Sequence, residues 1–224
     1  MAVPSDPMDA LLNAAEALMA ARHAQSQALG AGTGAVSLPC LWFFTDPKRT
    51  PDPLKVIARL PQGTGVVHRA FGRDEALSHA IIDACKARGI IVLIGKDERL
   101  ARSGGAHGVH LPASDMARAA AIREAWPRAI ITASHHEQEP PPAVQALDAL
   151  FLSPLFETRS GAGRRPLGTD VARAISASVT CPVYGLGGIT VARARALKGT
   201  GLAGFAAIDA VVSAAAYGQG RRPD

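Results

Sequence analysis

Residues 90–111 read IIVLIGKDERLARSGGAHGVHL. An apolar run, Ile90–Ile94, is followed by a charged segment with helical spacing at 96–103, a pair of glycines and a second apolar run, Gly108–Leu111. Short apolar runs that alternate with helical segments are typical of strand–helix–strand units in a parallel sheet. The stretch therefore predicts one such unit, with two buried strands lying side by side.

The same alternation extends along the chain in both directions. Eight apolar runs are expected to be strands: Pro39–Thr45, Gly65–Arg69, Ile90–Ile94, Gly108–Leu111, Ala129–Ala133, Ala149–Ser153, Pro182–Leu186 and Gly204–Ile208. Helices are expected near 52–60, 74–88, 96–103, 114–125, 138–146, 168–178, 190–198 and 209–217. Eight strands and eight helices predict an α/β fold, a closed (β/α)8 TIM barrel. A doubly wound open sheet is the competing architecture, but the turn Thr45-Asp46-Pro47 lacks the GxGxxG motif of dinucleotide-binding folds.

The chain outside this alternation is short. Residues 7–28 carry apolar side chains at helical spacing and predict an extra amphipathic helix. We therefore expect an N-terminal helix and linker at 1–34, the barrel at 35–218 and a C-terminal tail at 219–224. The helix is expected to pack on the barrel of its own chain or on a partner subunit. The second arrangement would make the protein a homodimer.

Composition excludes several classes of function. The net charge is +5, but the basic residues are dispersed and aromatic residues make up 4%, so neither a basic stripe nor a base-stacking platform for nucleic acid is expected. No run of about 18 uncharged apolar residues predicts a membrane span. The first residues lack a leading basic cluster, which indicates a cytoplasmic protein. Its three cysteines show no metal-ligand spacing and are expected to be buried thiols.

Two residues after the fifth predicted strand could carry proton chemistry. Active groups of such barrels follow the carboxyl ends of the strands, where Ser134 and His136 lie. A histidine titrates near neutral pH and can move a proton, although a solvated or locally hydrogen-bonded ring is the alternative interpretation. No third histidine or cysteine stands at ligand spacing, so no zinc site is expected.

The ends of the last two predicted strands give opposite indications about phosphate. Gly187-Gly188 leads into a helix, and its backbone N–H groups suit a phosphate, although the pair could also serve a tight turn alone. Asp209 is expected to be the N-cap of the last helix, where its charge would repel a phosphate. The basic, glycine-bearing loop 157–165 could be a flap over an anion or a solvated loop.

Four segments carry a family resemblance. GGAHGVHLPASD at 104–115 resembles the segment G-A-D-G-V-H-L-G-Q-E-D, and PVYGLGGIT at 182–190 resembles P-V-x-A-I-G-G-I-T. SPLFET at 153–158 resembles G-P-V-F-x-T, and Phe44-Thr45-Asp46 resembles the opening strand's I-T-D. Over about residues 38–213 the chain thus resembles the thiamine phosphate synthase and TenI superfamily.

This resemblance implies a barrel with one of two activities. The synthase joins a pyrimidine diphosphate to a thiazole phosphate and uses Mg²⁺ on the diphosphate. The TenI kind aromatises a carboxythiazole phosphate by moving a proton, without a metal, and uses a histidine that corresponds to His136. Either activity implies a phosphorylated thiazole or thiamine-related ligand.

The synthase pattern is only partly present. Its second-strand Q-x-R-x-K corresponds to Val67–Phe71, so Arg69 alone matches. Its Asn-Asp pair on the third strand falls on Gly95-Lys96, while the other metal-binding aspartate corresponds to Asp115. Its T-x-T-K motif corresponds to Thr158–Gly161, which keeps Thr158 and Ser160 and loses the lysine at Gly161. Asp209 replaces a phosphate-binding serine.

Three hypotheses follow. In the first, the chain is a TenI-like tautomerase without a cofactor, in which His136 shuttles the proton and Ser134 orients the substrate. Lys96 would then replace the charge of the metal, and the phosphate-binding and substrate-binding residues would be Arg69, Lys96, Thr158, Ser160, Gly187 and Gly188. In the second, it is a synthase with Mg²⁺ on Asp115. In the third, it is a non-catalytic barrel that binds a thiamine-related ligand.

Overall fold

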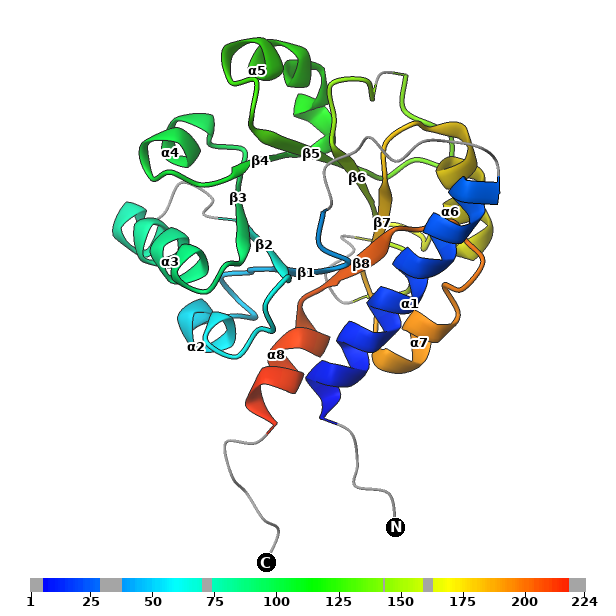
Figure 1. Cartoon of the computed structure of the whole chain (residues 1–224), viewed down its shortest axis with the longest axis horizontal. Coiled ribbons are helices and arrows are strands. Elements are labelled where there is room, and N and C mark those ends of the chain that lie inside the picture. The colour runs from blue at the N-terminus through cyan, green and yellow to red at the C-terminus, as the bar shows by residue number, and fades with distance from the viewer. Residues whose placement is uncertain (1–5, 29–37, 70–73, 143, 159–162, 218–224) are drawn as a thin grey trace, which may run out of the picture.

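The computed structural model describes residues 6–28, 38–69, 74–142, 144–158 and 163–217. Eight parallel strands form a closed barrel in chain order, and β8 pairs with β1 (Figure 1). The strands are β1 (Leu41–Phe44), β2 (Gly65–His68), β3 (Ile91–Gly95), β4 (Gly108–Leu111), β5 (Ile130–His135), β6 (Ala149–Leu152), β7 (Val183–Leu186) and β8 (Gly204–Ala207). The expected TIM barrel is confirmed, because an open sheet would leave β1 and β8 unpaired.

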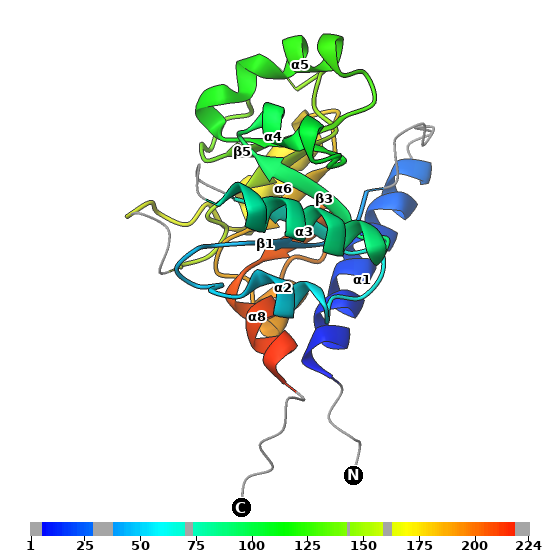
Figure 2. The ribbon, with the colours of Figure 1, turned by 90° about the vertical axis from the view of Figure 1, so that its left-hand side faces the viewer.

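Helices cover the outside of the barrel, and Figure 2 shows α2, α3 and α4 on one side of it. They are α1 (Pro7–Ala28), α2 (Pro53–Ile57), α3 (Glu75–Ala87), α4 (Glu98–Ser103), α5 (Ala119–Ala125), α6 (Gly168–Ser178), α7 (Val191–Arg195) and α8 (Asp209–Ala216), with a 3-10 turn, η1 (Ala113–Arg118), before α5. The helix expected at 138–146 is wrong, because the described residues there form turns. Pro140–Pro142 removes three backbone donors and opposes helical geometry.

Aromatic side chains fill the barrel interior. Trp42, Phe151 and Tyr184 are at most 1% exposed, and the ring centroids of Trp42 and Phe151 lie 5.6 Å apart. Phe44 lies above them, 5.0 Å from Phe151. Gly65 makes room for this layer, since a Cβ there would lie 2.2 Å from the Trp42 ring. The interior formed by these side chains is therefore a packed core.

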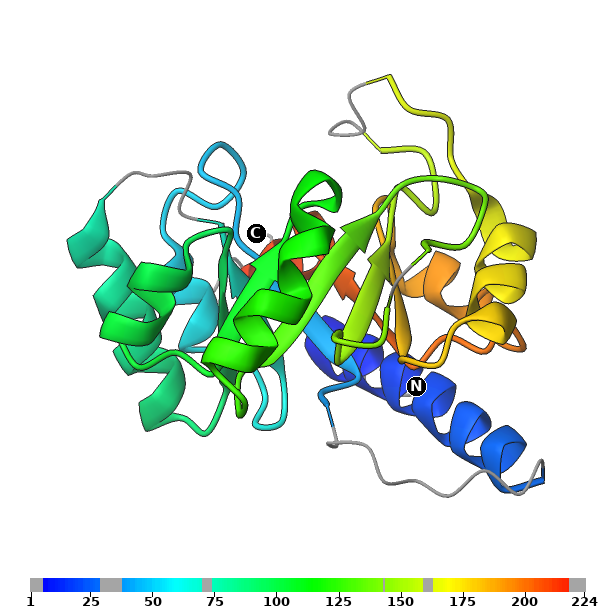
Figure 3. The ribbon, with the colours of Figure 1, turned by 90° about the horizontal axis from the view of Figure 1, so that it is seen from above.

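Helix α1 packs on the barrel of its own chain, one of the two arrangements expected for it. It contacts α7, α8 and the strands β1 and β8, and it buries Leu11, Ala15 and Leu18. Figure 3 shows α1 on the side of the barrel opposite the strand arrowheads. It leaves the carboxyl ends of the strands uncovered. In the described part of the chain, no helix combines the length and apolarity that a membrane crossing requires.

Candidate active site

A cavity of about 1770 Å³ opens at the carboxyl ends of the strands. Phe44 and His110 are among the residues that line it, and their ring centroids lie 5.1 Å apart. Among the described residues, eight lysines and arginines but five aspartates and glutamates line this space. The cavity exceeds the usual volume of a small-molecule site, and its charge excess favours an anionic ligand.

His136 follows β5 and lines the cavity. Its Nδ1 lies 2.6 Å from the carbonyl oxygen of Ser153 and 3.2 Å from the hydroxyl of the same residue. A carbonyl oxygen can only accept, so Nδ1 carries the proton and donates it to this bond. In the neutral ring Nε2 then holds a lone pair, as a general base requires.

Ser134, the second predicted catalytic residue, lines the cavity, and its hydroxyl belongs to a hydrogen-bond network beneath the cavity. Its hydroxyl lies 2.9 Å from Nε2 of His110, whose Nδ1 lies 2.9 Å from the hydroxyl of Thr132. Burial, the largest cause, together with the nearby Arg69 and His136, lowers the pKa of His110 to about 3, so the ring is neutral at physiological pH. This network fixes the position of the Ser134 hydroxyl at the cavity floor.

Lys96 lies in a strained three-residue turn at the end of β3. Its φ is +69°, and the amide of Asp97 donates to the carbonyl of Gly95 over 2.8 Å. Turns of this kind are rare for a residue with a side chain. The amide of Lys96 donates to the carbonyl of His110 over 2.8 Å, which helps to hold the turn. In the described part of the chain its ammonium has no carboxylate partner, and Lys96 lines the cavity.

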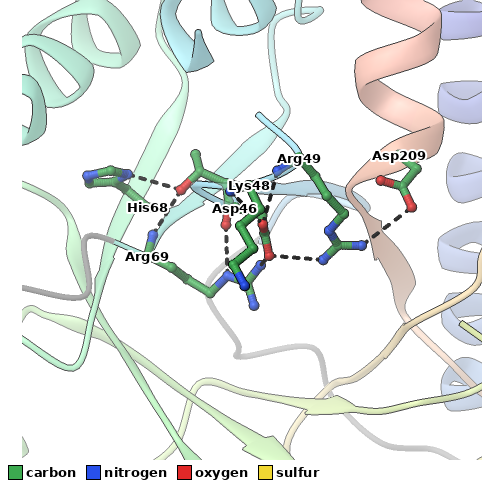
Figure 4. Close-up of polar contacts among 7 residues, drawn as sticks. Asp46, Lys48, Arg49, His68, Arg69 and Asp209 are labelled. Atoms are coloured by element: carbon green, nitrogen blue, oxygen red, sulfur yellow. Dashed lines mark hydrogen bonds and ion pairs between the residues drawn. The ribbon is translucent and has the colours of Figure 1, made fainter. Parts of the chain in front are cut away.

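Arg69 is held by β1 rather than left free for a ligand. Its Nε donates to the carbonyl of Thr45 over 2.8 Å, and its Nη2 donates to Asp46 over 2.9 Å (Figure 4). The guanidinium also lies 5.9 Å from the centre of the Phe44 ring, within range of a cation–π contact. Burial would raise the pKa of the Asp46 carboxyl, but the hydrogen bonds and charge of Arg49 outweigh it and lower the pKa.

The expectation that Asp209 caps the last helix is wrong. Ile208 is the N-cap of α8, and no side chain caps that end. The Asp209 carboxylate is instead 3.4 Å from Nη1 of Arg49, and the side chain is 61% exposed. The error arises because the helix begins one residue earlier than expected, which moves Asp209 into the first helical turn.

The two glycines after β7 allow a close approach of two loops. Gly187 and Gly188 have φ values of +97° and +66°. A Cβ on Gly188 would lie 2.4 Å from the carbonyl oxygen of Glu157 in the loop after β6. Arg193 donates to the carbonyls of Gly188 and Glu157 over 2.8 and 3.1 Å, which ties both loops together. Both glycines line the cavity.

Asp115 and Asp97, the two aspartates considered for Mg²⁺, both have other partners in the described residues. Asp115 does not line the cavity, and its carboxylate accepts from Ser114 over 2.9 Å and pairs with Arg118 at 3.5 Å. Asp97 accepts from the amide of Leu100 as the N-cap of α4. In the described ranges no three histidine, cysteine or carboxylate side chains gather for a metal ion. Mg²⁺ is usually held by one or two carboxylates together with substrate phosphates and water.

The remaining predicted positions divide between the cavity and the undescribed residues. Thr158 lines the cavity. Ser160, together with the departures noted at Phe71 and Gly161, lies outside the described residues. Sequence analysis missed Arg49, which lines the cavity between two carboxylates. Its position two residues beyond the Thr45-Asp46-Pro47 turn was the available signal.

Comparison with known proteins identifies similar chains. The family model described as thiamine monophosphate synthase matches residues 73–211. A thiamine-phosphate synthase of Chlorobium luteolum is 32% identical over 187 residues, which cover 79% of this chain and 86% of that protein. The thiamine biosynthesis bifunctional protein ThiM/ThiE of Symbiobacterium thermophilum is 36% identical over 136 residues, or 59% of this chain and 28% of that longer protein.

A solved structure gives the same fold. Thiamine phosphate pyrophosphorylase from Pyrococcus furiosus superposes with a TM-score of 0.63 and 24% sequence identity. The superposition covers 80% of this chain and 96% of that one. At this identity the likeness supports the architecture of the barrel rather than the chemistry of the cavity.

Proposed function

The chain belongs to the thiamine monophosphate synthase family, which confirms the resemblance seen in its sequence, and from that premise we propose that it is a TenI-like thiazole phosphate tautomerase. The reaction moves a proton between two atoms of one substrate and consumes no other reagent. The observation that carries the proposal is the 2.6 Å contact between Nδ1 of His136 and the carbonyl oxygen of Ser153. Because Nδ1 donates its proton to this carbonyl, the lone pair of Nε2 can act as the base.

Each step uses a group that lines the cavity. His136 takes a proton from a ring carbon of the substrate at Nε2 and returns it to another atom. The imidazolium formed in between donates through Nδ1 to Ser153, which stabilises its charge. Ser134, fixed by His110, hydrogen-bonds the substrate, and the Lys96 ammonium stabilises the negative charge that forms as the proton leaves. The amides of Gly187 and Gly188 hold the phosphate.

The test compares two neighbouring histidines. His136→Asn is expected to lower the isomerisation rate of carboxythiazole phosphate by about 10²–10⁴-fold, the usual contribution of a general base, while substrate affinity changes little. His135→Asn is the matched control, because the His135 ring is buried, contacts the Glu139 carbonyl at 2.7 Å and does not line the cavity. Proton NMR of the substrate measures both rates. Absence of isomerisation by the unmodified protein refutes the proposal.

A thiamine phosphate synthase is the second candidate, and the names of the relatives favour it. In this case the pyrimidine diphosphate and the thiazole phosphate would occupy the cavity together. The assay supplies both compounds and measures thiamine phosphate over a range of Mg²⁺ concentrations. Product formation that requires Mg²⁺ would establish this candidate in place of the first. Saturable binding of thiazole phosphate without turnover in either assay would establish the non-catalytic barrel.

A further inference from the structure

Ion pairs connect into one cluster four charged side chains that line one side of the cavity and follow the ends of β1, β2 and β8 (Figure 4): Asp46, Arg49, Arg69 and Asp209. At its centre Asp46 accepts hydrogen bonds from the amides of Lys48 and Arg49 and from the guanidinium groups of Arg49 and Arg69, over 2.9 to 3.1 Å. All four contacts stabilise its carboxylate. Asp46 is therefore a fixed anchor, because its two oxygens are already occupied.

Arg49 is the member of the cluster that keeps donors for a ligand. Its Nη2 donates to Asp46 over 3.1 Å, and its Nη1 to Asp209 over 3.4 Å. A guanidinium carries five N–H groups, so these two contacts leave three of them without a partner in the described residues. The side chain is 21% exposed and lines the cavity. Arg49 is thus held in place by Asp46 while it presents unused donors.

The contact between Arg49 and Asp209 is weak enough for a ligand group to replace Asp209. Its 3.4 Å distance is at the long end of the hydrogen-bond range, and Asp209 is 61% exposed. Exposed ion pairs of this kind contribute little stability. Asp209 lies in the first turn of α8, where the helix N-terminus also favours an anion. An anionic group of a ligand at this position would bind the Arg49 guanidinium that Asp209 contacts, and the Asp209 carboxylate would repel it.

We propose that Arg49 determines specificity in this site by adding a charged contact to the ligand phosphate that the amides of Gly187 and Gly188 hold, and that Asp209 competes for the same guanidinium. The pair sets how strongly a phosphorylated ligand is preferred over its unphosphorylated form. This inference rests on the proposed function only because it places a thiazole phosphate in the same cavity. It requires no turnover, so binding measurements test it separately.

The experiment measures binding of thiazole phosphate and of the same thiazole alcohol without phosphate by calorimetry. Arg49→Gln is expected to weaken thiazole phosphate binding roughly tenfold to a hundredfold, as for loss of a hydrogen bond to a charged group, and to leave the alcohol unchanged. Arg49→Lys should weaken binding less than Arg49→Gln, because lysine keeps the positive charge but lacks the planar set of guanidinium donors. Asp209→Asn should tighten phosphate binding about fivefold by removing a nearby like charge.

A second ion pair on the same chain supplies the controls. Arg173 and Asp170 pair at 2.8 Å on α6, are largely exposed and do not line the cavity. Arg173→Gln and Asp170→Asn should therefore change neither affinity, and thermal unfolding verifies that every variant is folded. Equal losses for both ligands in Arg49→Gln, or no loss for either, would overturn the inference. Loss of phosphate preference in a protein that isomerises nothing would support it while refuting the tautomerase.

Discussion

Two substitutions of Lys96 separate its charge from its backbone. Lys96→Ala and Lys96→Gly both remove the ammonium from the cavity, but only glycine relieves the positive φ of +69°. A left-handed conformation destabilises the folded state by about 1–2 kcal/mol for a residue with a Cβ, and glycine avoids this strain. Glycine also makes the unfolded chain more flexible, which offsets about 0.5–1 kcal/mol of that gain in stability. We expect the glycine variant to be more stable than the alanine variant by about 1 kcal/mol.

Ligand binding should respond differently from stability. Both variants lose the same ammonium, so both should weaken binding of carboxythiazole phosphate by the same factor, roughly tenfold or more. Thermal unfolding should show a midpoint about 2–4 °C higher for glycine than for alanine, the shift expected in a chain of this size. Calorimetry measures the two affinities on the same samples.

Two results would refute this reasoning. Equal stability of Lys96→Ala and Lys96→Gly would mean that the turn relaxes and stores no strain. Unchanged affinity in both variants would mean that the ammonium does not contact the ligand, although Lys96 lines the cavity. Lys48→Ala is a suitable control for general loss of charge, because Lys48 follows β1 but does not line the cavity.

Three further predictions concern the loops, acid stability and metal. Gly188→Ala should abolish ligand binding and lower stability by about 1–3 kcal/mol, because its Cβ would lie 2.4 Å from the Glu157 carbonyl oxygen. Gly63 has a similar φ of +77° but open space around it, so Gly63→Ala should lower stability without affecting binding. Calorimetry measures binding, and urea unfolding measures stability. Burial lowers the pKa of His68 from 6.5 to about 4, so below pH 6.5 the unfolded chain binds a proton that the native chain does not. Stability should therefore fall by up to about 1.4 kcal/mol per pH unit down to about pH 4, and urea unfolding of His68→Asn between pH 7 and 4.5 should show a flatter loss. EDTA should leave isomerisation unchanged, since Asp115 pairs with Arg118 away from the cavity; a rate restored only by Mg²⁺ would contradict this.

The barrel could be predicted because its signal is local. Each strand is a short apolar run, and each was located within about two residues of its observed bounds. The helix expected at 138–146 is wrong because the three prolines of Pro140–Pro142 lack backbone donors and their ring geometry opposes a helix, which the alternation of strands and helices does not reveal. The register that closes β1 on β8 joins residues more than 160 positions apart, so it was inferred from the count of strands rather than from any local pattern.

The site was less predictable than the fold because its geometry depends on pairing between distant residues. His136 and the glycine pair could be placed at strand ends, since the end of a strand is visible in the sequence. The pairing of Arg49 with Asp209 spans 160 positions and has no local signal. The positive φ of Lys96 is equally hidden, because lysine has no preference for that conformation.

The pairing of charges in the cavity bears on the choice between the two reactions. Enzymes that displace a diphosphate neutralise it with Mg²⁺ and several cationic side chains. Here most cavity arginines are already paired with carboxylates: Arg49 and Arg69 with Asp46, Arg99 with Glu75, and Arg102 and Arg118 with Glu98. In the described part of the chain, Lys96, Arg164 and Arg193 line the cavity without a carboxylate partner, and Arg193 donates to the carbonyls of Gly188 and Glu157. Lys96 and Arg164 follow β3 and β6, three strands apart around the barrel. The cations that can serve a ligand, Lys96, Arg164 and the unused donors of Arg49, are therefore spread around the cavity. This arrangement suits a ligand with a carboxylate and a phosphate monoester better than a diphosphate and its metal, which favours proton transfer within one thiazole substrate.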